Sequence, residues 1–70
     1  MLLKALYKEV PMWKVLDEPV SGWLNEGQVV VWTGEKRDAG DQLINGEWLQ
    51  VYTPNGILGW IFSDNLGEVI

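Results

Sequence analysis

Carboxylates are the most numerous side chains in this sequence that could take part in catalysis or bind a metal ion. The sequence has ten Asp and Glu residues against five Lys and Arg, and it contains no His and no Cys. Oxygen ligands suit Ca²⁺, and Glu35, Asp38 and Asp41 stand close enough in sequence to contribute to one site. Their spacing matches no EF-hand loop, so the pattern favours a charged, solvated loop instead.

Catalysis finds little support in these residue types. Two carboxylates can hydrolyse a sugar bond as acid and base, but nothing in the sequence marks two of the ten as a buried pair. The absence of His and Cys removes the commonest general base, imidazole and thiolate metal ligands, and disulfides. We therefore expect a protein that is not an enzyme, with no cofactor and no metal.

The charge balance bears on partners and location. The net charge is −5 and the only adjacent cations are Lys36 and Arg37, whereas phosphate backbones are bound by clusters of Lys and Arg. Lys4 and Lys8 interrupt the first apolar stretch, which argues against a signal peptide. No stretch reaches the roughly 20 apolar residues of a spanning helix. We expect no nucleic acid, no membrane association and a cytoplasmic location.

Short apolar runs between turn residues predict one all-β domain over 1–70. Eight Gly and three Pro interrupt runs rich in Val, Ile, Trp and Tyr, which is the pattern of short strands. We expect strands at 2–10 and 28–32, a loop over 11–22 that folds back on itself, and a solvated connection over 33–46. About five such strands favour a small closed barrel, since closure protects strand edges.

The clearest local signal is a hairpin within NGEWLQVYTPNGILGWIFSDNL, residues 45–66. Pro54, Asn55 and Gly56 fit successive positions of a type I turn and its bulge. Because strand side chains alternate between faces, the turn fixes the register. The predicted inner face holds Leu49, Val51, Ile57, Gly59 and Ile61, and the outer face holds Trp48, Gln50, Tyr52, Leu58, Trp60 and Phe62.

Two further predictions concern the end of the hairpin and the other tryptophans. Ser63 and Asp64 favour a 3₁₀ turn that leads into a last short strand. For Trp13, Trp23 and Trp32 we expect packing in a small core and its rim, because each aromatic side chain can bury a large area.

The order of these segments resembles the Src-homology-3 fold. ALYKEV at 5–10 is similar to the segment that opens eukaryotic members, and WLNEGQVVV at 23–31 is similar to their diverging turn and second strand. GEWLQV and NGILGWIFSDNL resemble the Trp-bearing strand, the distal hairpin and the 3₁₀ turn. Gly-Trp-Ile at 59–61 is closest to the bacterial branch. The resemblance implies a Src-homology-3-like barrel.

The resemblance also implies a binding site. In eukaryotic members a proline-rich peptide lies across a groove of aromatic side chains beside an acidic loop. Tyr7 matches the first groove tyrosine, Trp48 matches the groove tryptophan, and Asp17 and Glu18 fall in the acidic loop.

Three departures from the groove pattern argue against proline-motif binding. Glu9 and Asn65 replace tyrosines of the groove, and Phe62 replaces its proline. Bacterial members often bind peptidoglycan or serve as accessory modules of larger exported enzymes.

The leading hypothesis is a protein-interaction module, of a kind that suits a small phage or bacterial accessory protein. Its partner would be a protein or peptide that carries apolar and basic residues. One alternative is a cell-wall or carbohydrate-binding module, whose tryptophans stack on sugar rings. Another is a structural protein that self-associates, and the oligomeric state stays open. The expected binding residues are Tyr7, Trp48, Trp60 and Phe62, flanked by Asp17 and Glu18.

Overall fold

The computed structural model describes residues 1–38 and 46–69, and this part of the chain is built mainly of strands. A 3₁₀ turn, η1 (Ser63–Asn65), separates the last two strands, and the described residues contain no other helix. The all-β fold class and the C-terminal 3₁₀ turn are therefore confirmed. The strands are β1 (Leu2–Ala5), β2 (Glu9–Met12), β3 (Gly22–Asn25), β4 (Val29–Asp38), β5 (Glu47–Tyr52), β6 (Leu58–Phe62) and β7 (Leu66–Glu68).

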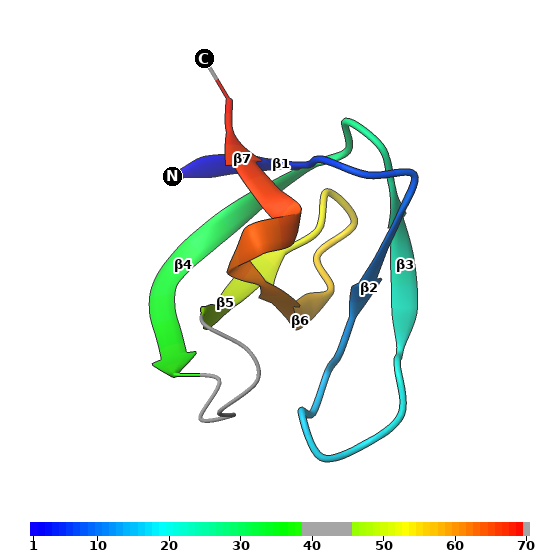
Figure 1. Ribbon diagram of the computed structural model, residues 1–70, viewed down its shortest axis with the longest axis vertical. Helices are drawn as coiled ribbons and strands as arrows, with labels where there is room; N and C mark the ends of the chain where they lie inside the picture. The colour runs from blue at the N-terminus through cyan, green and yellow to red at the C-terminus, as the bar shows by residue number, and fades with distance from the viewer. Residues whose placement is uncertain (39–45, 70) are drawn as a thin grey trace.

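The strands form two antiparallel sheets. The larger sheet has five strands in the order β6-β5-β4-β1-β7, and the smaller one is the β2–β3 hairpin. One backbone bridge joins them: Trp13 N–H donates to Trp60 O at 3.0 Å, and Trp60 N–H donates to Trp13 O at 2.6 Å. In the described residues β3 pairs with β2 alone, so the two sheets are not closed into the expected barrel (Figure 1).

The first predicted strand is two strands. β1 pairs with β4 and β7, whereas β2 pairs with β3, so the chain must leave one sheet for the other at residues 6–8. At this change Leu6 N–H donates to Asn65 O at 3.0 Å. Pro11 and Met12 belong to β2 rather than to a loop, although the following segment does fold back on β2 as expected.

The predicted connection over 33–46 is wrong in its first part, because β4 continues to Asp38. The ladder between β4 and β5 shifts register between Trp32 and Lys36, and Gly34 adopts a φ of 96° within this bulge. Glycine tolerates that conformation without steric cost, so the strand resumes beyond it. Residues 39–45 lie outside the described part of the chain.

The hairpin of β5 and β6 has the predicted turn and register. Gly56 has a φ of 83° and donates its N–H to Thr53 O at 2.9 Å. Across the two strands, Leu49 pairs with Ile61 and Val51 pairs with Gly59. The hairpin therefore turns its aliphatic face inward.

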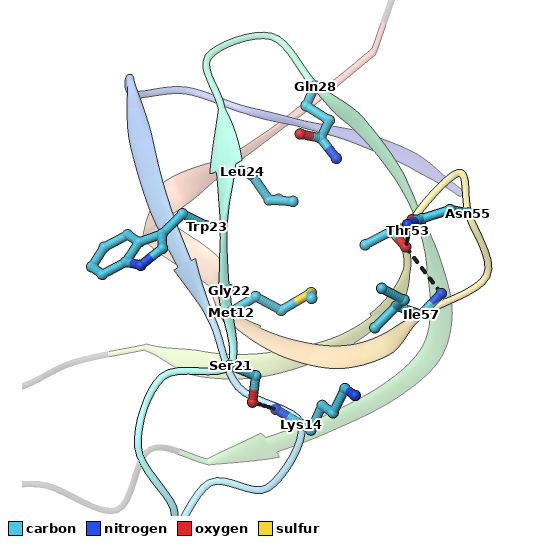
Figure 2. A pocket seen from close by; sticks show the side chains of 10 residues that line it. All are labelled: Met12, Lys14, Ser21, Gly22, Trp23, Leu24, Gln28, Thr53, Asn55 and Ile57. Atoms are coloured by element: carbon cyan, nitrogen blue, oxygen red, sulfur yellow. Dashed lines mark hydrogen bonds between the residues drawn. The ribbon is translucent and has the colours of Figure 1, made fainter.

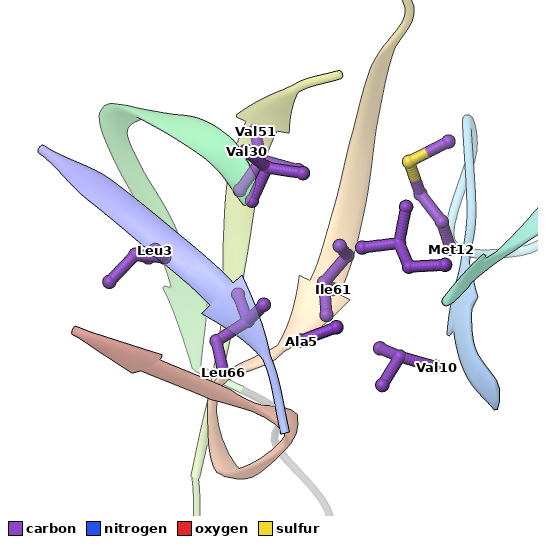
Figure 3. Packing of buried hydrophobic residues seen from close by; sticks show 9 residues of the cluster. Leu3, Ala5, Val10, Met12, Val30, Val51, Ile61 and Leu66 are labelled. Carbon is purple, nitrogen blue, oxygen red and sulfur yellow. The ribbon is translucent and has the colours of Figure 1, made fainter. Parts of the chain in front are cut away.

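Both sheets contribute to one apolar core. Val10, Val51 and Ile61 are completely buried at its centre, and Figure 3 shows side chains converging from the two sheets. Trp32, Leu49 and Ile57 pack against the core from its edge. The buried core residues are Leu3, Ala5, Val10, Met12, Leu24, Val30, Val51, Ile61 and Leu66.

Candidate functional site

The outer face of β5 and β6 gathers three of the expected binding residues. Trp48 on β5 lies directly opposite Phe62 on β6, and Trp60 lies opposite Gln50 in the neighbouring row. Cross-strand partners project to the same face of a sheet. All three aromatic side chains are half-buried, so they present part of their surface to solvent and pack the rest against neighbours.

Trp13 completes this aromatic surface from the other sheet. Its ring centroid lies 5.1 Å from that of Trp48 at an interplanar angle of 78°, and Trp48 meets Phe62 at 5.4 Å and 71°. Edge-to-face contacts of this kind are favoured by the charge distribution of the rings. The backbone bridge to Trp60 holds Trp13 in place. We call Trp13, Trp48, Trp60 and Phe62 the aromatic plate.

Arg37 adds a positive charge to the aromatic plate. It pairs with Trp48 across β4 and β5, and its guanidinium carbon lies 4.9 Å from the centroid of the Trp60 ring. A guanidinium over an indole is attracted by the ring's negative face. The adjacent Lys36 forms an exposed salt bridge with Glu47 at 3.3 Å. Arg37 reaches the plate because β4 extends beyond its bulge, whereas Lys36 pairs with Leu49 of the opposite face.

The other three expected site residues lie on loops. Tyr7 is 57% exposed at the bend between β1 and β2, and no ring contact of the described residues involves it. Asp17 and Glu18 are exposed on the loop between β2 and β3, which leaves the aromatic plate directly after Trp13. Within the described residues, only Trp48, Trp60 and Phe62 of the expected set are therefore brought together by strand register or ring contacts.

Sequence reasoning missed Trp13 and Arg37 as members of this site. Trp13 lies in the segment 11–22 that the sequence predicts to be a loop, so alternation assigns it no face. Arg37 lies in the segment 33–46 that the sequence predicts to be a solvated connection. The packing expected of Trp32 is present, and its Nε1 also donates to Glu35 O at 2.9 Å. Trp23 is different: it is 61% exposed on the edge strand β3, so its expected packing is wrong.

The carboxylates considered at the outset do not gather in the described residues. Glu35 and Asp38 lie in β4, and Asp41 falls outside the described part of the chain. Among residues 1–38 and 46–69, no group of three or more His, Cys, Asp or Glu is placed to hold a metal ion.

The two sheets meet along a seam, which the aromatic plate covers on one side. On the other side of this seam, a cavity lies where β3 faces the turn between β5 and β6. Its volume is about 240 Å³. Met12, Leu24 and Ile57 give it an apolar floor, and polar residues stand at its rim (Figure 2). The remaining lining residues are Lys14, Ser21, Gly22, Trp23, Gln28, Thr53 and Asn55.

Comparison of the chain with family models, with curated proteins and with solved structures finds no match. The described residues contain no helix of the length and apolarity that crossing a membrane requires. Function must therefore be argued from the aromatic plate and the cavity themselves.

Proposed function

We propose that this chain is a non-enzymatic protein-interaction module that binds a protein or peptide at the aromatic plate. The observation that carries the proposal is the contact chain from Trp13 through Trp48 to Phe62 on the outer face of the sheet. Because these rings pack against one another, their side chains lose little conformational entropy when a partner binds. Large aromatics and arginine are also the residues that dominate binding energy at protein interfaces.

Charge gives the proposed partner its chemistry. Asp17 and Glu18 follow Trp13 on an exposed loop, so basic residues of a partner would meet them while its apolar residues cover the plate. Charges at the rim of an interface act mainly on the association rate and its salt dependence. The proposed partner is therefore a protein or peptide segment with apolar and basic residues.

The strand order supports a Src-homology-3-like fold as part of this proposal. The β2–β3 hairpin follows β1, the consecutive strands β4, β5 and β6 form a meander, and η1 leads to β7 beside β1. The cytoplasm is the proposed compartment, and the absence of cysteine is compatible with its reducing conditions.

Ring geometry favours protein over carbohydrate as the ligand of the plate. A sugar ring stacks on an open aromatic face, but Arg37 covers the ring of Trp60. Trp13 and Trp48 meet edge to face at 78°, so their rings do not form one flat platform.

The test compares two tryptophan variants in a pull-down from cell lysate. Trp48→Ala should lose the partner, whereas Trp23→Ala should retain it, because Trp23 is exposed on β3 away from the plate. Far-UV circular dichroism establishes that each variant is folded. If Trp48→Ala captured every partner of the parent, or if it unfolded, the plate would be packing rather than a binding site.

Two further variants examine charge without opening a hole in the plate. Arg37→Ala should weaken capture because it removes the cation over Trp60. Reversal of Asp17 and Glu18 to Lys should weaken capture more at low salt than at high salt. Binding to purified peptidoglycan tests the cell-wall alternative, and sedimentation of the protein alone at several concentrations tests self-association. Binding to peptidoglycan or self-association through Trp48 would replace the proposal by one of its alternatives.

A further inference from the structure

The cavity between β3 and the β5–β6 turn exists because the two sheets are sealed along one side and not along the other. Trp13 and Trp60 bridge the sheets at the aromatic plate. On the opposite side, β3 begins at Gly22, which has no side chain to fill the space (Figure 2). The gap therefore reaches the core side chains Met12 and Leu24, which are almost fully buried.

In the wall of the cavity, the side-chain amide oxygens of Gln28 and Asn55 already accept hydrogen bonds, so their amide nitrogens remain available as donors. Gln28 Oε1 accepts the N–H of Asn25 at 3.2 Å, so the amide nitrogen of Gln28 is left to donate, and Figure 2 shows this nitrogen directed toward the space between the walls. Asn55 Oδ1 accepts the hydroxyl of Thr53 at 2.6 Å, which leaves the Asn55 amide nitrogen as a donor. Thr53 Oγ1 itself accepts the N–H of Ile57 at 3.0 Å.

The end of the cavity opposite Gln28 carries a cation and a hydroxyl, from Lys14 and Ser21 (Figure 2). Ser21 Oγ accepts the backbone N–H of Lys14 at 2.9 Å, and the serine O–H remains able to donate. The Lys14 side chain is exposed beside the cavity, and the ion pair found in residues 1–38 and 46–69 joins Lys36 to Glu47 instead. The polar side chains of the rim thus offer N–H and O–H groups above an apolar floor.

We propose that this cavity binds a small aliphatic carboxylate. The carboxylate oxygens accept hydrogen bonds from the amide nitrogens of Gln28 and Asn55, and the hydrocarbon part contacts the apolar floor and extends toward Lys14 at the other end of the cavity (Figure 2). Small-molecule sites combine apolar walls with a few convergent polar groups in this way. A cavity of about 240 Å³ has room for an acid of the size of hexanoate.

The inference is independent of the protein-interaction function, because the cavity and the aromatic plate share no residue. The same carboxylate chemistry occurs on a free fatty acid and at the C-terminus of a peptide that ends in an aliphatic residue. Hexanoate represents the first source and N-acetyl-leucine the second. Tighter binding of hexanoate would indicate a free fatty acid as the ligand, and tighter binding of N-acetyl-leucine would indicate a peptide C-terminus.

The experiment is a titration of the full chain followed by amide chemical shifts. Hexanoate should give saturable shifts centred on residues 21–24, 28 and 53–57, and hexanamide should bind about tenfold more weakly because it lacks the charge. The same comparison applies to N-acetyl-leucine and its amide. The proposal is overturned if neither acid gives saturable shifts at these residues, or if the amides bind as tightly as the acids.

Variants of the donors test the assigned roles. Gln28→Glu keeps an oxygen for the Asn25 N–H but removes the donor, so it should weaken hexanoate binding about tenfold or more. Gln50→Glu introduces the same change on the outer face and should leave the affinity unchanged. Equal effects of Gln28→Glu and Gln50→Glu would contradict the proposal.

A filling variant tests the place of binding. Gly22 has the same strand parity as the buried Leu24, and a Cβ built on it meets nothing within 4 Å. Gly22→Leu should therefore keep the fold, occupy the cavity and abolish hexanoate binding. Partner capture at the aromatic plate should persist in this variant. Retention of hexanoate affinity by a folded Gly22→Leu protein would overturn the cavity as the site.

Discussion

The two sides of the seam between the sheets differ in what fills them. On one side Trp13 and Trp60 exchange two backbone hydrogen bonds, and the rings of Trp13, Trp48 and Phe62 cover the junction. On the other side Gly22 and Ser21 face the turn between β5 and β6 across a cavity of about 240 Å³. The comparison shows that side-chain volume at a few positions decides whether such a seam becomes a surface or a pocket.

Both sides depend on the core between them, so a core substitution should have the largest effect. Ile61 is completely buried, and Ile61→Ala should lower the free energy of unfolding by about 2 to 4 kcal/mol through lost transfer energy and a cavity. Leu58→Ala on the same strand is the control, because Leu58 is 39% exposed. Urea denaturation followed by circular dichroism measures both. Similar losses from the two variants would contradict the inner and outer assignment of β6.

The sealed side can be broken at Trp13. Trp13→Ala removes the ring that contacts Trp48 while the backbone bridge can persist, and we expect a loss of about 1 to 3 kcal/mol. Trp23→Ala, with its side chain 61% exposed on β3, should change stability by no more than about 0.5 kcal/mol. The denaturation midpoints of the two variants give the comparison. A larger loss of stability from Trp23→Ala than from Trp13→Ala would contradict the view that the ring contacts of the aromatic plate stabilise the fold.

The open side should respond in the opposite direction. Gly22→Ala adds a methyl group where the Cβ meets nothing within 4 Å, in a strand whose φ at this position is not positive. Replacing a strand glycine in this way restricts the unfolded chain, so stability should rise by about 0.5 to 1 kcal/mol. Thermal unfolding would detect this gain. A fall in stability would mean that the space beside Gly22 is needed by the fold.

The smallest effect is expected at the charged rim of β4. Lys36 and Glu47 form a salt bridge at 3.3 Å, but their side chains are 56% and 45% exposed. Glu47→Gln should therefore change the free energy of unfolding by at most about 0.5 kcal/mol, and less in high salt. Urea denaturation at two salt concentrations measures the difference. A salt-insensitive loss above about 1 kcal/mol would show that the pair does more than stabilise an exposed strand end.

Alternation and turn chemistry made the β5–β6 hairpin predictable from the sequence alone. Pro54, Asn55 and Gly56 specify the turn, and the turn sets which face Val51 and Ile61 occupy. The 3₁₀ turn is also predictable, because Ser63 and Asp64 are residue types that favour such turns, although in the structure Ser63 Oγ accepts the N–H of Glu47 at 3.1 Å and no side chain caps the turn. These features depend on residues close together in the chain.

Tertiary structure decided what the chain does between distant segments. The division into β1 and β2 follows from their different partner strands, and β4 passes Gly34 because its far half pairs with β5. No local pattern places Trp13 beside Trp48, because the two residues come from different sheets that meet at the bridge between Trp13 and Trp60. Gln28 and Asn55 line one cavity because β4 and β5 are neighbours in the larger sheet. The sequence by itself therefore determined an all-β chain and an aromatic hairpin face. The seam, its sealed plate and its open cavity depend on contacts between segments far apart in sequence, which alternation and turn residues do not encode.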